Sequence, residues 1–317
     1  MKLAVILDPL PTLKIYKDSS YAIMLEAQKR GHEVYVLQQQ DLYLRNAQVI
    51  ARAQGLNIAP ESKPWFTLVS HDEMALNQFD IVLMRKDPPL DLQYLYTTHL
   101  LDLAERSGAR VFNRPQALRE LNEKLAILNF PEFIAPTLVT SQSSLIRAFL
   151  EEHQDIILKP LDGMGGSGIF RVQRNEQNFN VIVESLTQIG TRAIMAQRYI
   201  PEIARGDKRI LVIAGQPVPY ALARIPQGGD PRGNLAAGGK GVVQVLSARD
   251  REIAERLGPY LQQAGVFLAG LDIIGDYLTE INVTSPTCLQ EISQATECNV
   301  AAMVLLALEA EIGGKLT

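Results

Sequence analysis

Residues 270–287 read GLDIIGDYLTEINVTSPT, and this stretch leaves the chain few ways to fold. Two apolar runs, Leu271–Ile274 and Leu278–Val283, flank Gly275-Asp276, a pattern typical of a β-hairpin. Side chains alternate between the two faces of a strand, so Glu280 and Asn282 share one face of the second run, while Thr279, Ile281 and Val283 point to the other. The hairpin therefore has one face for a core and one face that carries oxygen ligands.

The polar face of this hairpin carries Glu280 and Asn282, and Asp272 joins them only if the connection has the right length. If residues 275–277 form a three-residue loop, Asp272 lies opposite Glu280. A two-residue turn would reverse the alternation and place Asp272 on the apolar face. We expect the three-residue loop, because the apolar residues of the first run then extend the apolar face of the second.

Aspartate, glutamate and asparagine oxygens gathered on one sheet face are hard ligands suited to Mg²⁺. Proteins usually hold this ion with one or two carboxylates together with substrate phosphates, so the pattern indicates a nucleotide site. The competing interpretation is a hairpin whose polar face simply lies in water. Three residues of these types are weakly specific by themselves, so the rest of the chain decides between the two.

The composition indicates a globular protein of about two domains, since the chain has 317 residues. Hydrophobic residues make up 47% of it and charged residues 21%, which is enough for a large core. A formal net charge of -4 gives no general attraction to nucleic acid or to an anionic membrane. No apolar run approaches the ~20 residues of a membrane-spanning helix, and the N-terminal run, which stops at Asp8-Pro9, is too short for a signal peptide.

The cysteines and histidines argue against several kinds of site. Cys288 and Cys298 lack a C-x-x-C spacing and are too few for a disulfide framework. The four histidines are scattered, which gives little support for a zinc site or a histidine-based triad. We therefore expect a cytoplasmic protein with free thiols.

The first half of the chain alternates strands with helices. Strands are expected at Lys2–Leu7, Val34–Leu37, Asp80–Met84 and Arg110–Phe112, and helices from the cap at Asp18-Ser19-Ser20 to Gly31 and over Leu92–Arg106. This order predicts a parallel, Rossmann-like sheet, whose ligands gather beyond the carboxyl ends of the strands. The polar section between the second and third strands is expected to consist mainly of loops. Residues 115–122 are the expected domain boundary, followed by a helix that contains Lys124.

Arg85 directly follows the third expected strand and is a candidate for a substrate contact. Its planar guanidinium suits a carboxylate. A surface arginine paired with Asp87 explains this segment equally well.

Residues 161–168, LDGMGGSG, lie between an expected strand at Ile156–Pro160 and an apolar run at Ile169–Val172. The spacing of Gly163, Gly165 and Gly168 matches the dinucleotide-binding fingerprint. That fingerprint needs a helix after the glycines, however, and this sequence continues as a strand. A P-loop is also excluded, because no lysine followed by serine or threonine closes the run. We expect the tip of a β-hairpin whose bare N–H groups approach phosphates, with Lys159 beneath it as a point charge.

The remaining part of the second half predicts a sheet and a long glycine-rich loop. Arg209 and Arg224 lie on expected strands of this part, which cover 193–197, 209–213 and 218–225. A loop as long as 226–241 is usually functional, and we expect a lid that shields a phosphorylated intermediate from water. Helices are expected at 179–188, 248–264 and 299–311.

With these elements in place, the chain resembles the ATP-grasp superfamily and, most closely within it, the bacterial glutathione synthetases. The resemblance covers nearly the whole chain. It depends on MRKDPP at 84–89, ILKPLDGMGG at 157–166, GDKRILV at 206–212, ARIPQGG at 223–229, RGNLAAGGKG at 232–241 and GLDIIGDYLTEINVTSPTC at 270–288. One small departure is the tip sequence Gly166-Ser167-Gly168, where the family pattern has less glycine.

The resemblance implies an α/β protein with an ATP-grasp fold preceded by an N-terminal Rossmann-like domain. Residues 1–122 would form the substrate-binding N-terminal domain and residues 123–317 the ATP-grasp domain. Within the latter, 123–200 would clamp the nucleotide, and 201–317 would carry the catalytic residues and the lid loop 226–241.

The resemblance also implies roles for individual residues. The nucleotide would contact Lys124, Lys159, Gly163, Gly165, Gly166, Gln197, Arg198, Tyr199, Ile200 and Asp207. Mg²⁺, with Mn²⁺ as a substitute, would bind Asp272, Glu280 and Asn282. The groups that stabilise the transferring phosphoryl group would be Arg209, Arg224 and Lys159. The substrate would contact Asp18, Ser19, Arg85, Gly239, Ser285, Thr287 and Glu291.

The implied activity is the ATP-dependent ligation of γ-glutamylcysteine and glycine through an acyl phosphate, with release of ADP and phosphate. Positioning and charge stabilisation suffice for this chemistry, so it needs no side-chain nucleophile. Two alternatives are another ATP-grasp carboxylate–amine ligase, of the D-alanine–D-alanine or glutamate-adding type, and a non-catalytic nucleotide-binding protein. The implied partners are the small-molecule substrates and further copies of the chain in a homotetramer, with no nucleic acid and no membrane.

Overall fold

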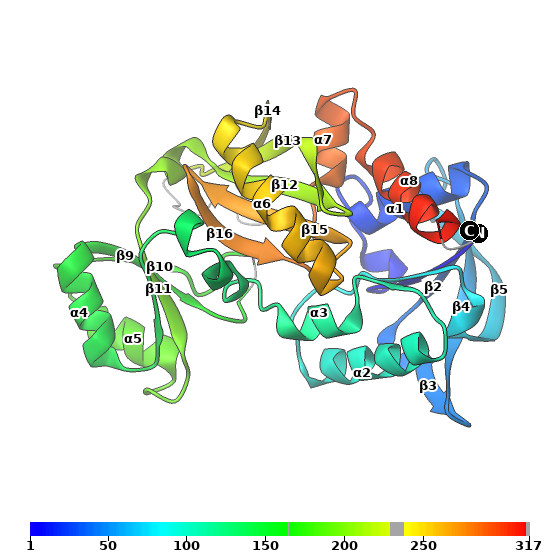
Figure 1. Cartoon of the computed structure of the whole chain (residues 1–317), viewed down its shortest axis with the longest axis horizontal. Helices are drawn as coiled ribbons and strands as arrows, with labels where there is room; N and C mark the ends of the chain where they lie inside the picture. The colour runs from blue at the N-terminus through cyan, green and yellow to red at the C-terminus, as the bar shows by residue number, and fades with distance from the viewer. Residues whose placement is uncertain (164, 229–237, 315–317) are drawn as a thin grey trace.

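The computed structural model describes residues 1–163, 165–228 and 238–314. The described strands form a seven-stranded N-terminal sheet, a four-stranded sheet in a small lobe and a five-stranded central sheet. Figure 1 shows the small lobe with α4 and α5 at one end of the molecule, the N-terminal sheet at the other end and the central sheet between them. The expected α/β class is confirmed.

The N-terminal sheet contains the predicted parallel strands. These are β1 (Lys2–Ile6), β2 (Glu33–Leu37), β6 (Ile81–Met84) and β7 (Val111–Phe112). Helices α1 (Ser19–Lys29) and α2 (Leu92–Arg106) begin after Asp18 and Asp91, whose carboxylates accept backbone N–H groups of the first helical turn. A short helix, α3 (Pro115–Glu120), follows β7.

The section between β2 and β6 forms three strands, so the prediction of loops is wrong. β3 (Leu42–Arg45), β4 (Gln48–Ile58) and β5 (Phe66–Ala75) extend the sheet in an antiparallel manner. The strand β5 alternates half-buried with exposed side chains, and Thr67 and Glu73 are among the exposed ones. An antiparallel strand with one wet face has a mixed composition, so polarity alone does not distinguish it from a loop. The sheet is therefore mixed and not wholly parallel.

The small lobe confirms the glycine-rich hairpin. β9 (Asp155–Pro160) pairs antiparallel with β10 (Phe170–Gln173), so a strand and not a helix follows the glycines. β11 (Ile194–Arg198) and β8 (Thr137–Thr140) complete this sheet. The helices α4 (Ser143–His153) and α5 (Phe179–Thr187) pack on it and share its buried aliphatic cluster.

The central sheet is antiparallel throughout. Its strands are β12 (Asp207–Ile213), β13 (Gln216–Ile225), β14 (Lys240–Val245), β15 (Leu268–Ile274) and β16 (Tyr277–Asn282). The helix α6 (Ala248–Ala264) packs on this sheet, and the buried aliphatic side chains at the contact include Ile253, Leu257, Leu261, Ile210, Leu271 and Ile281. Each such side chain contributes about 1.5–3 kcal/mol on burial. The opposite face carries polar groups at one end, including Arg209 and Arg224, and buried aliphatic side chains such as Leu211 and Leu222 at the other.

The hairpin of β15 and β16 has a shorter connection than we expected. Ile274 pairs with Tyr277 across a two-residue turn, so the prediction of a three-residue loop is wrong. A β-bulge at Thr279 inserts one residue into β16, and Asp272 consequently still lies opposite Glu280. The predicted pairing of the two carboxylates is confirmed, because the bulge restores the alternation that a two-residue turn reverses.

Lys124 lies in a turn before a 3₁₀ helix, so the prediction of a helix around it is wrong. The side chain of Asn122 accepts the backbone N–H groups of Lys124 and Leu125 at 3.0 Å each, which favours a turn over a helix. The 3₁₀ helices are Leu10–Thr12, Gln39–Asp41, Leu76–Gln78, Ala126–Asn129, Pro131–Phe133 and Pro201–Arg205.

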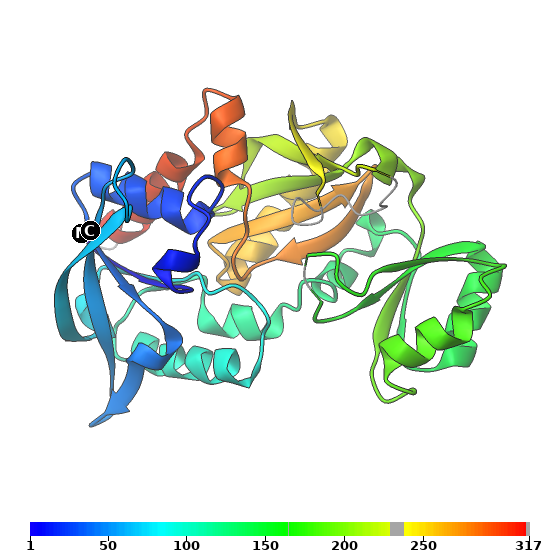
Figure 2. The ribbon, with the colours of Figure 1, turned by 180° about the vertical axis from the view of Figure 1, so that it is seen from behind.

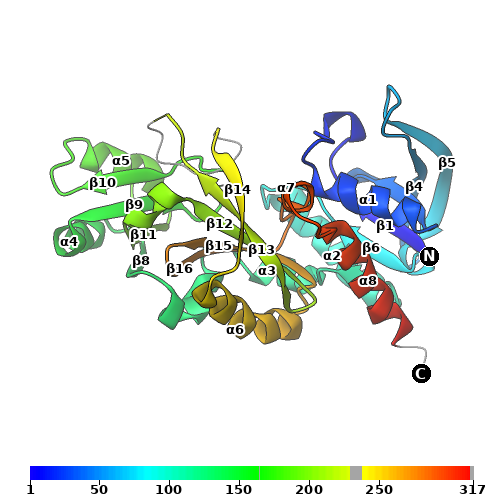
Figure 3. The same cartoon turned by 90° about the horizontal axis from the view of Figure 1, so that it is seen from above.

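The C-terminal helices return to the N-terminal sheet. After α7 (Leu289–Ala295), the helix α8 (Val300–Gly313) packs along α1 (Figures 1 and 3). The carboxylate of Glu309 on α8 binds Arg30 and His32. None of the helices in the described ranges is long and apolar enough to cross a bilayer.

The expected lid loop 226–241 is described only at its ends. Residues 229–237 lie outside the described part of the chain, and the segment from Lys240 onward forms β14.

Candidate active site

Two clefts meet on the polar face of the central sheet. The first, of about 130 Å³, lies between the small lobe and the central sheet, and its apolar walls are Ile157, Ile169, Ile200, Ile203 and Ile274. The second, of about 560 Å³, lies between the central sheet and the N-terminal sheet. Gly165 and Glu280 line both clefts and therefore mark their junction.

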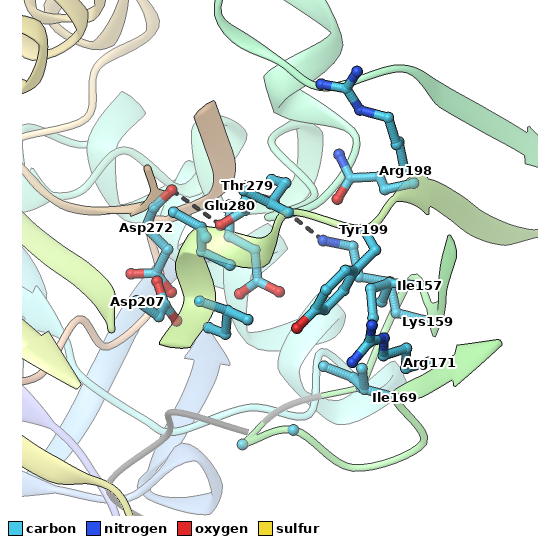
Figure 4. Close-up of a pocket in the computed structure, with 17 residues that line it drawn as sticks. Ile157, Lys159, Ile169, Arg171, Arg198, Tyr199, Asp207, Asp272, Thr279 and Glu280 are labelled. Atoms are coloured by element: carbon cyan, nitrogen blue, oxygen red, sulfur yellow. Dashed lines mark hydrogen bonds between the residues drawn. The ribbon is translucent and has the colours of Figure 1, made fainter. Parts of the chain in front are cut away.

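Most residues predicted to bind a nucleotide line the first cleft. They are Lys159, Gly163, Gly165, Gly166, Gln197, Arg198, Tyr199, Ile200 and Asp207. Figure 4 shows Tyr199 and Arg171 on one side of this cleft and the carboxylates of Asp207, Asp272 and Glu280 on the other. An apolar slot with a charged end suits a ligand that has a flat ring at one end and polar groups at the other.

Sequence reasoning missed Arg171, which lines the first cleft. Its guanidinium lies 3.7 Å from the centroid of the Tyr199 ring and makes hydrogen bonds of 2.6–3.2 Å to both carboxylate oxygens of Asp155. The ion pair fixes the position of Arg171, and the guanidinium of Arg171 in turn holds the aromatic ring of Tyr199 at the cleft. Ile169 and Arg171 are two positions apart beside the glycine-rich tip, a spacing that could have identified a shared face.

Two buried lysines lie beside the glycine-rich tip. Lys159 donates to the carbonyl of Thr279 at 3.3 Å, and burial lowers the pKa of its ammonium. Lys124 lines neither cleft, but it donates to the carbonyl of Gly163 at 2.7 Å and lies 3.6 Å from the Glu280 carboxylate. The Lys124 side chain therefore connects the tip to the hairpin of β15 and β16.

Four charged side chains form a buried network on the central sheet. The carboxylate of Asp272 accepts hydrogen bonds from Arg209 at 2.8 Å and forms an ion pair with Arg224 at 2.9 Å. Burial alone would raise the pKa of Asp272, but the two guanidinium groups hold it well below its usual range. Arg224 also binds Asp207, yet burial raises the pKa of Asp207 to about 7. One oxygen of Asp207, Oδ1, is buried without a hydrogen-bond partner in the described structure.

Asp272, Glu280 and Asn282 lie together on the hairpin and fit a magnesium ion. Asp272 pairs with Glu280 across the strands, and the Asn282 amide lies 3.4 Å from Asp272 Oδ2. All three supply hard oxygen atoms, and the low pKa keeps Asp272 anionic. In the described part of the chain, no three acidic, histidine or cysteine side chains converge on a metal position. The set therefore suits an ion that takes its other ligands from phosphates and water.

The second cleft is lined by segments that follow β1, β6 and β16. Of the predicted substrate residues, Asp18, Ser285, Thr287 and Glu291 line it, and Arg209, Arg224 and Asn282 face it from the central sheet. Figure 2 shows the connection from β16 to α7 beside the residues that follow β1. The site is therefore assembled from parts of the chain that are far apart in the sequence.

Arg85 and Ser19 lie beneath the second cleft and line neither cleft. Arg85 is 6% exposed, and its Nε donates to Ser20 at 3.0 Å and its Nη2 to the carbonyl of Pro286 at 2.9 Å. Ser19 accepts the backbone N–H of Leu289 at 3.3 Å. Both side chains therefore fasten α1 to the connection between β16 and α7. Gly239 also lies outside the lining of both clefts.

The lysines of the second cleft were not assigned from the sequence. Lys14 and Lys17 follow β1, and Lys86 follows β6 and pairs with Asp8 at 2.8 Å. Their position beyond the carboxyl ends of parallel strands is the signal that could have identified them.

Two family models together match most of the chain. The model described as "Prokaryotic glutathione synthetase, N-terminal domain" matches residues 1–119, and "Prokaryotic glutathione synthetase, ATP-grasp domain" matches residues 123–297. The chain belongs to the prokaryotic glutathione synthetase family. Members of this family are ATP-dependent ligases that bind ATP with a metal ion, so the predicted enzyme class and nucleotide are confirmed.

Curated relatives support the same conclusion. The chain is 60% identical to the glutathione synthetase of Nitrosomonas europaea over 99% of each chain. It is 49% identical to that of Escherichia coli K12 over 98% of this chain and 99% of the relative.

Solved structures support the ATP-grasp fold alone, because their sequences are distant. The D-cycloserine synthetase DcsG superposes with a TM-score of 0.69 at 14% identity, covering 98% of this chain and 100% of that one. The ATP-grasp ligase PsnB superposes with a TM-score of 0.64 at 16% identity, covering 97% and 98%. The predicted fold is confirmed.

Proposed function

We propose that this protein uses ATP to join the cysteinyl carboxylate of γ-glutamylcysteine to the amine of glycine, which yields glutathione, ADP and phosphate. The single observation that carries the proposal is the junction of the two clefts at Glu280 and Gly165, with Arg209 and Arg224 beside it. A nucleotide in the first cleft and a peptide in the second would present a phosphate to a carboxylate at this point.

The first cleft is proposed as the nucleotide site. The adenine would lie between the isoleucine walls, with its polar edge at the backbone of 197–200. Asp207, whose Oδ1 is buried without a partner, would accept a hydrogen bond from a ribose hydroxyl. The glycine-rich tip and Lys159 would hold the phosphates, while Lys124 would keep the tip close to Glu280.

Asp272, Glu280 and Asn282 would hold Mg²⁺, or Mn²⁺ in its place, and the ion would neutralise phosphate charge and polarise the transferring phosphoryl group. Arg209 and Arg224 already pair with Asp272. Their positive charges would therefore stabilise both the Asp272 carboxylate and the oxygens of the transferring phosphoryl group.

Two covalent steps follow from this arrangement. In the first, an oxygen of the cysteinyl carboxylate attacks the γ-phosphorus in line, and the bond from that phosphorus to ADP breaks. In the second, the neutral glycine amine attacks the acyl carbon, the amide forms, and phosphate leaves as the amine loses a proton. The roles of Arg209, Arg224 and Lys159 are to orient the reactants and to stabilise the negative charge that develops.

The second cleft is proposed as the dipeptide site. Ser285, Thr287, Glu291 and Asp18 would contact the substrate directly. Arg85 and Ser19 would act indirectly, because their polar groups hold the connection between β16 and α7 in position. Gly239 would contact the substrate as the relationship to glutathione synthetases implies, although it lines neither cleft in the described structure.

Isotope transfer tests the proposed chemistry. We expect γ-glutamylcysteine labelled with ¹⁸O in its cysteinyl carboxylate to give glutathione and inorganic phosphate that carries one ¹⁸O atom, because the acyl phosphate transfers that oxygen. Unlabelled phosphate with normal glutathione formation would contradict the acyl-phosphate step.

We also propose a cytoplasmic homotetramer with a substrate-binding domain at 1–122 and an ATP-grasp domain at 123–317, the latter divided near residue 200. The full-length relationship to bacterial glutathione synthetases supports this assignment. Light scattering of the purified protein tests the oligomer, and a monomer at micromolar concentration would contradict it.

A further inference from the structure

Glu123 lies beside the junction of the two clefts, and none of the steps proposed above uses it. It lines the second cleft, and its side chain is 20% exposed. The neighbouring Lys124 side chain is only 2% exposed, and it connects the glycine-rich tip to the hairpin of β15 and β16. Glu123 therefore places a second carboxylate next to Lys124, in addition to that of Glu280.

The backbone of Glu123 is fixed to the strand that carries two of the proposed metal ligands. Its carbonyl accepts the backbone N–H of Ile281 at 2.8 Å. Ile281 lies on β16 between Glu280 and Asn282. This hydrogen bond keeps the turn that contains Lys124 beside the metal ligands of β16.

Lys124 lies between two carboxylates at unequal distances. Its Nζ atom is 2.5 Å from Glu123 Oε1 and 3.6 Å from Glu280 Oε1. The same atom donates to the carbonyl of Gly163 at 2.7 Å. A separation of 3.6 Å is too long for a hydrogen bond, so the ammonium is bonded to Glu123 and to the tip but not to Glu280.

The charges of these three side chains depend on one another. Burial alone would lower the pKa of Lys124, but the carboxylates of Glu280 and Glu123 raise it, so the side chain stays an ammonium. Burial and the charge of Glu280 raise the pKa of Glu123, whereas Lys124 lowers it. The ammonium therefore allows the two carboxylates to remain close together, and the carboxylate that pairs with it is less available to any other cation.

We propose that Glu123 is a positioning residue for phosphoryl transfer, because it holds the Lys124 ammonium away from Glu280 and leaves the Glu280 carboxylate to the metal ion. The inference rests on the proposed function, in which Glu280 is a metal ligand. Without the charge of Glu123, the ammonium would pair fully with Glu280, and the metal ion would have to compete with it for that carboxylate.

Glu123→Gln tests this role because it removes the charge and keeps the size of the side chain. Mn²⁺ is the probe, and electron paramagnetic resonance of the free ion follows its binding to protein saturated with a non-hydrolysable ATP analogue, with the analogue alone as reference. Lys124→Met and the double variant complete a cycle that shows whether Glu123 acts through Lys124. Glu120→Gln is the matched control, since Glu120 is an exposed carboxylate that lines neither cleft.

Glu123→Gln should raise the Kd for Mn²⁺ about 10- to 100-fold, the usual cost of losing a group that orients a metal ligand. In the Lys124→Met background the same substitution should change the Kd by less than about twofold, because no ammonium is left to compete for Glu280. In the complete reaction, added Mg²⁺ should restore the kcat of Glu123→Gln, and the KM for γ-glutamylcysteine should stay within about twofold of wild type. A general loss of folding would not respond to Mg²⁺ in this way.

Three results would overturn the inference. The first is a Kd for Mn²⁺ in Glu123→Gln equal to that of wild type. The second is a rise in Kd that persists in the Lys124→Met background, which would mean that Glu123 acts through the general potential of the cleft. The third is a loss of kcat that saturating Mg²⁺ does not restore, and this result decides the question even if Lys124→Met does not fold.

Glu280→Gln separates a failure of this inference from a failure of the proposed function. If this variant bound Mn²⁺ as tightly as wild type, Glu280 would not be a metal ligand, and the proposed metal site itself would be wrong. Weaker binding in Glu280→Gln together with unchanged binding in Glu123→Gln would contradict the role of Glu123 alone.

Discussion

The two clefts of this protein differ in how they are built. The first is lined mainly by two local units, the hairpin of β9 and β10 and the segment that ends β11, together with residues of the central sheet. The second is assembled from loops after β1, β6 and β16, which come from both ends of the chain. Strand pairing within a local unit keeps its residues together independently of the rest of the fold. The second cleft, in contrast, forms only when the N-terminal and central sheets pack against each other.

This difference decides the type of interaction in each cleft. The first offers apolar walls and a carboxylate end, and it suits a ligand that is the same for every ATP-dependent ligase. The second offers charged side chains of both signs, several of them paired within the protein. Substitutions in one cleft should therefore change the kinetics of one substrate, and those at the junction should affect both.

The largest effect is expected at the junction. Glu280→Gln should lower kcat on the order of 10²–10³-fold for the complete reaction, because it removes an anionic metal ligand at the point where phosphoryl transfer occurs. Steady-state kinetics with saturating Mg²⁺ measures this loss, and circular dichroism checks the fold. Near-normal turnover would remove Glu280 from the metal site, and Glu297→Gln, outside both clefts, is the control.

A smaller effect, confined to the second cleft, is expected for Arg85→Ala. The substitution leaves Ser20 and the Pro286 carbonyl without their donor, and it should destabilise the protein by about 2–4 kcal/mol. The KM for γ-glutamylcysteine should rise more than the KM for ATP, because the β16–α7 connection loses its anchor. Urea denaturation and kinetics measure the two effects. A higher KM without any loss of stability would indicate a direct substrate contact instead.

The matching change in the first cleft is Ile169→Ala. Loss of apolar contact with the base should cost about 1–2 kcal/mol of nucleotide binding, or roughly a 5- to 30-fold higher Kd. Calorimetric titration with an ATP analogue measures this, with Val181→Ala on the exposed face of α5 as control. If the KM for γ-glutamylcysteine rose as much as that for ATP, the two clefts would not be independent.

A separate effect, on stability and not on substrate kinetics, is a pH dependence at Asp207. Burial raises its pKa from 3.8 to about 7, so between these values the native state keeps a proton that the unfolded chain has lost. The unfolded state then binds fewer protons, and the free energy of unfolding falls as pH rises through this window. Asp207→Asn removes the contribution. The stability of wild type relative to the variant should therefore decline between about pH 4 and pH 7, and parallel curves in urea denaturation would contradict the assignment.

The same contrast explains which features could be predicted from the sequence. The glycine-rich tip and Lys159 depend on strand alternation and turn chemistry within one short stretch, so their common position was predictable, whereas the 197–200 segment was assigned only through the family resemblance. The facing of Asp272 and Glu280 was also predicted, although through the wrong loop, because the burial of one hairpin face requires it and the Thr279 bulge supplies it.

Features that depend on tertiary packing escaped prediction. Arg85 has the right type and position for a substrate contact, but the docking of α1 against the β16–α7 connection turns its guanidinium away from the cleft. The second cleft brings together Lys17 and Glu291 from opposite ends of the chain, and no local pattern contains that information. The strands β3, β4 and β5 escaped because antiparallel strands with a wet face resemble polar loops.

The most direct test of the central claim is ADP release by the purified protein with Mg-ATP, measured together with glutathione formation. We predict that ADP forms only when γ-glutamylcysteine and glycine are both present, with one glutathione for each ADP. Turnover with D-alanine or glutamate in place of glycine would contradict the assignment of the substrates while keeping the fold and the nucleotide cleft. Binding of ATP without turnover in any combination would contradict the account as a whole.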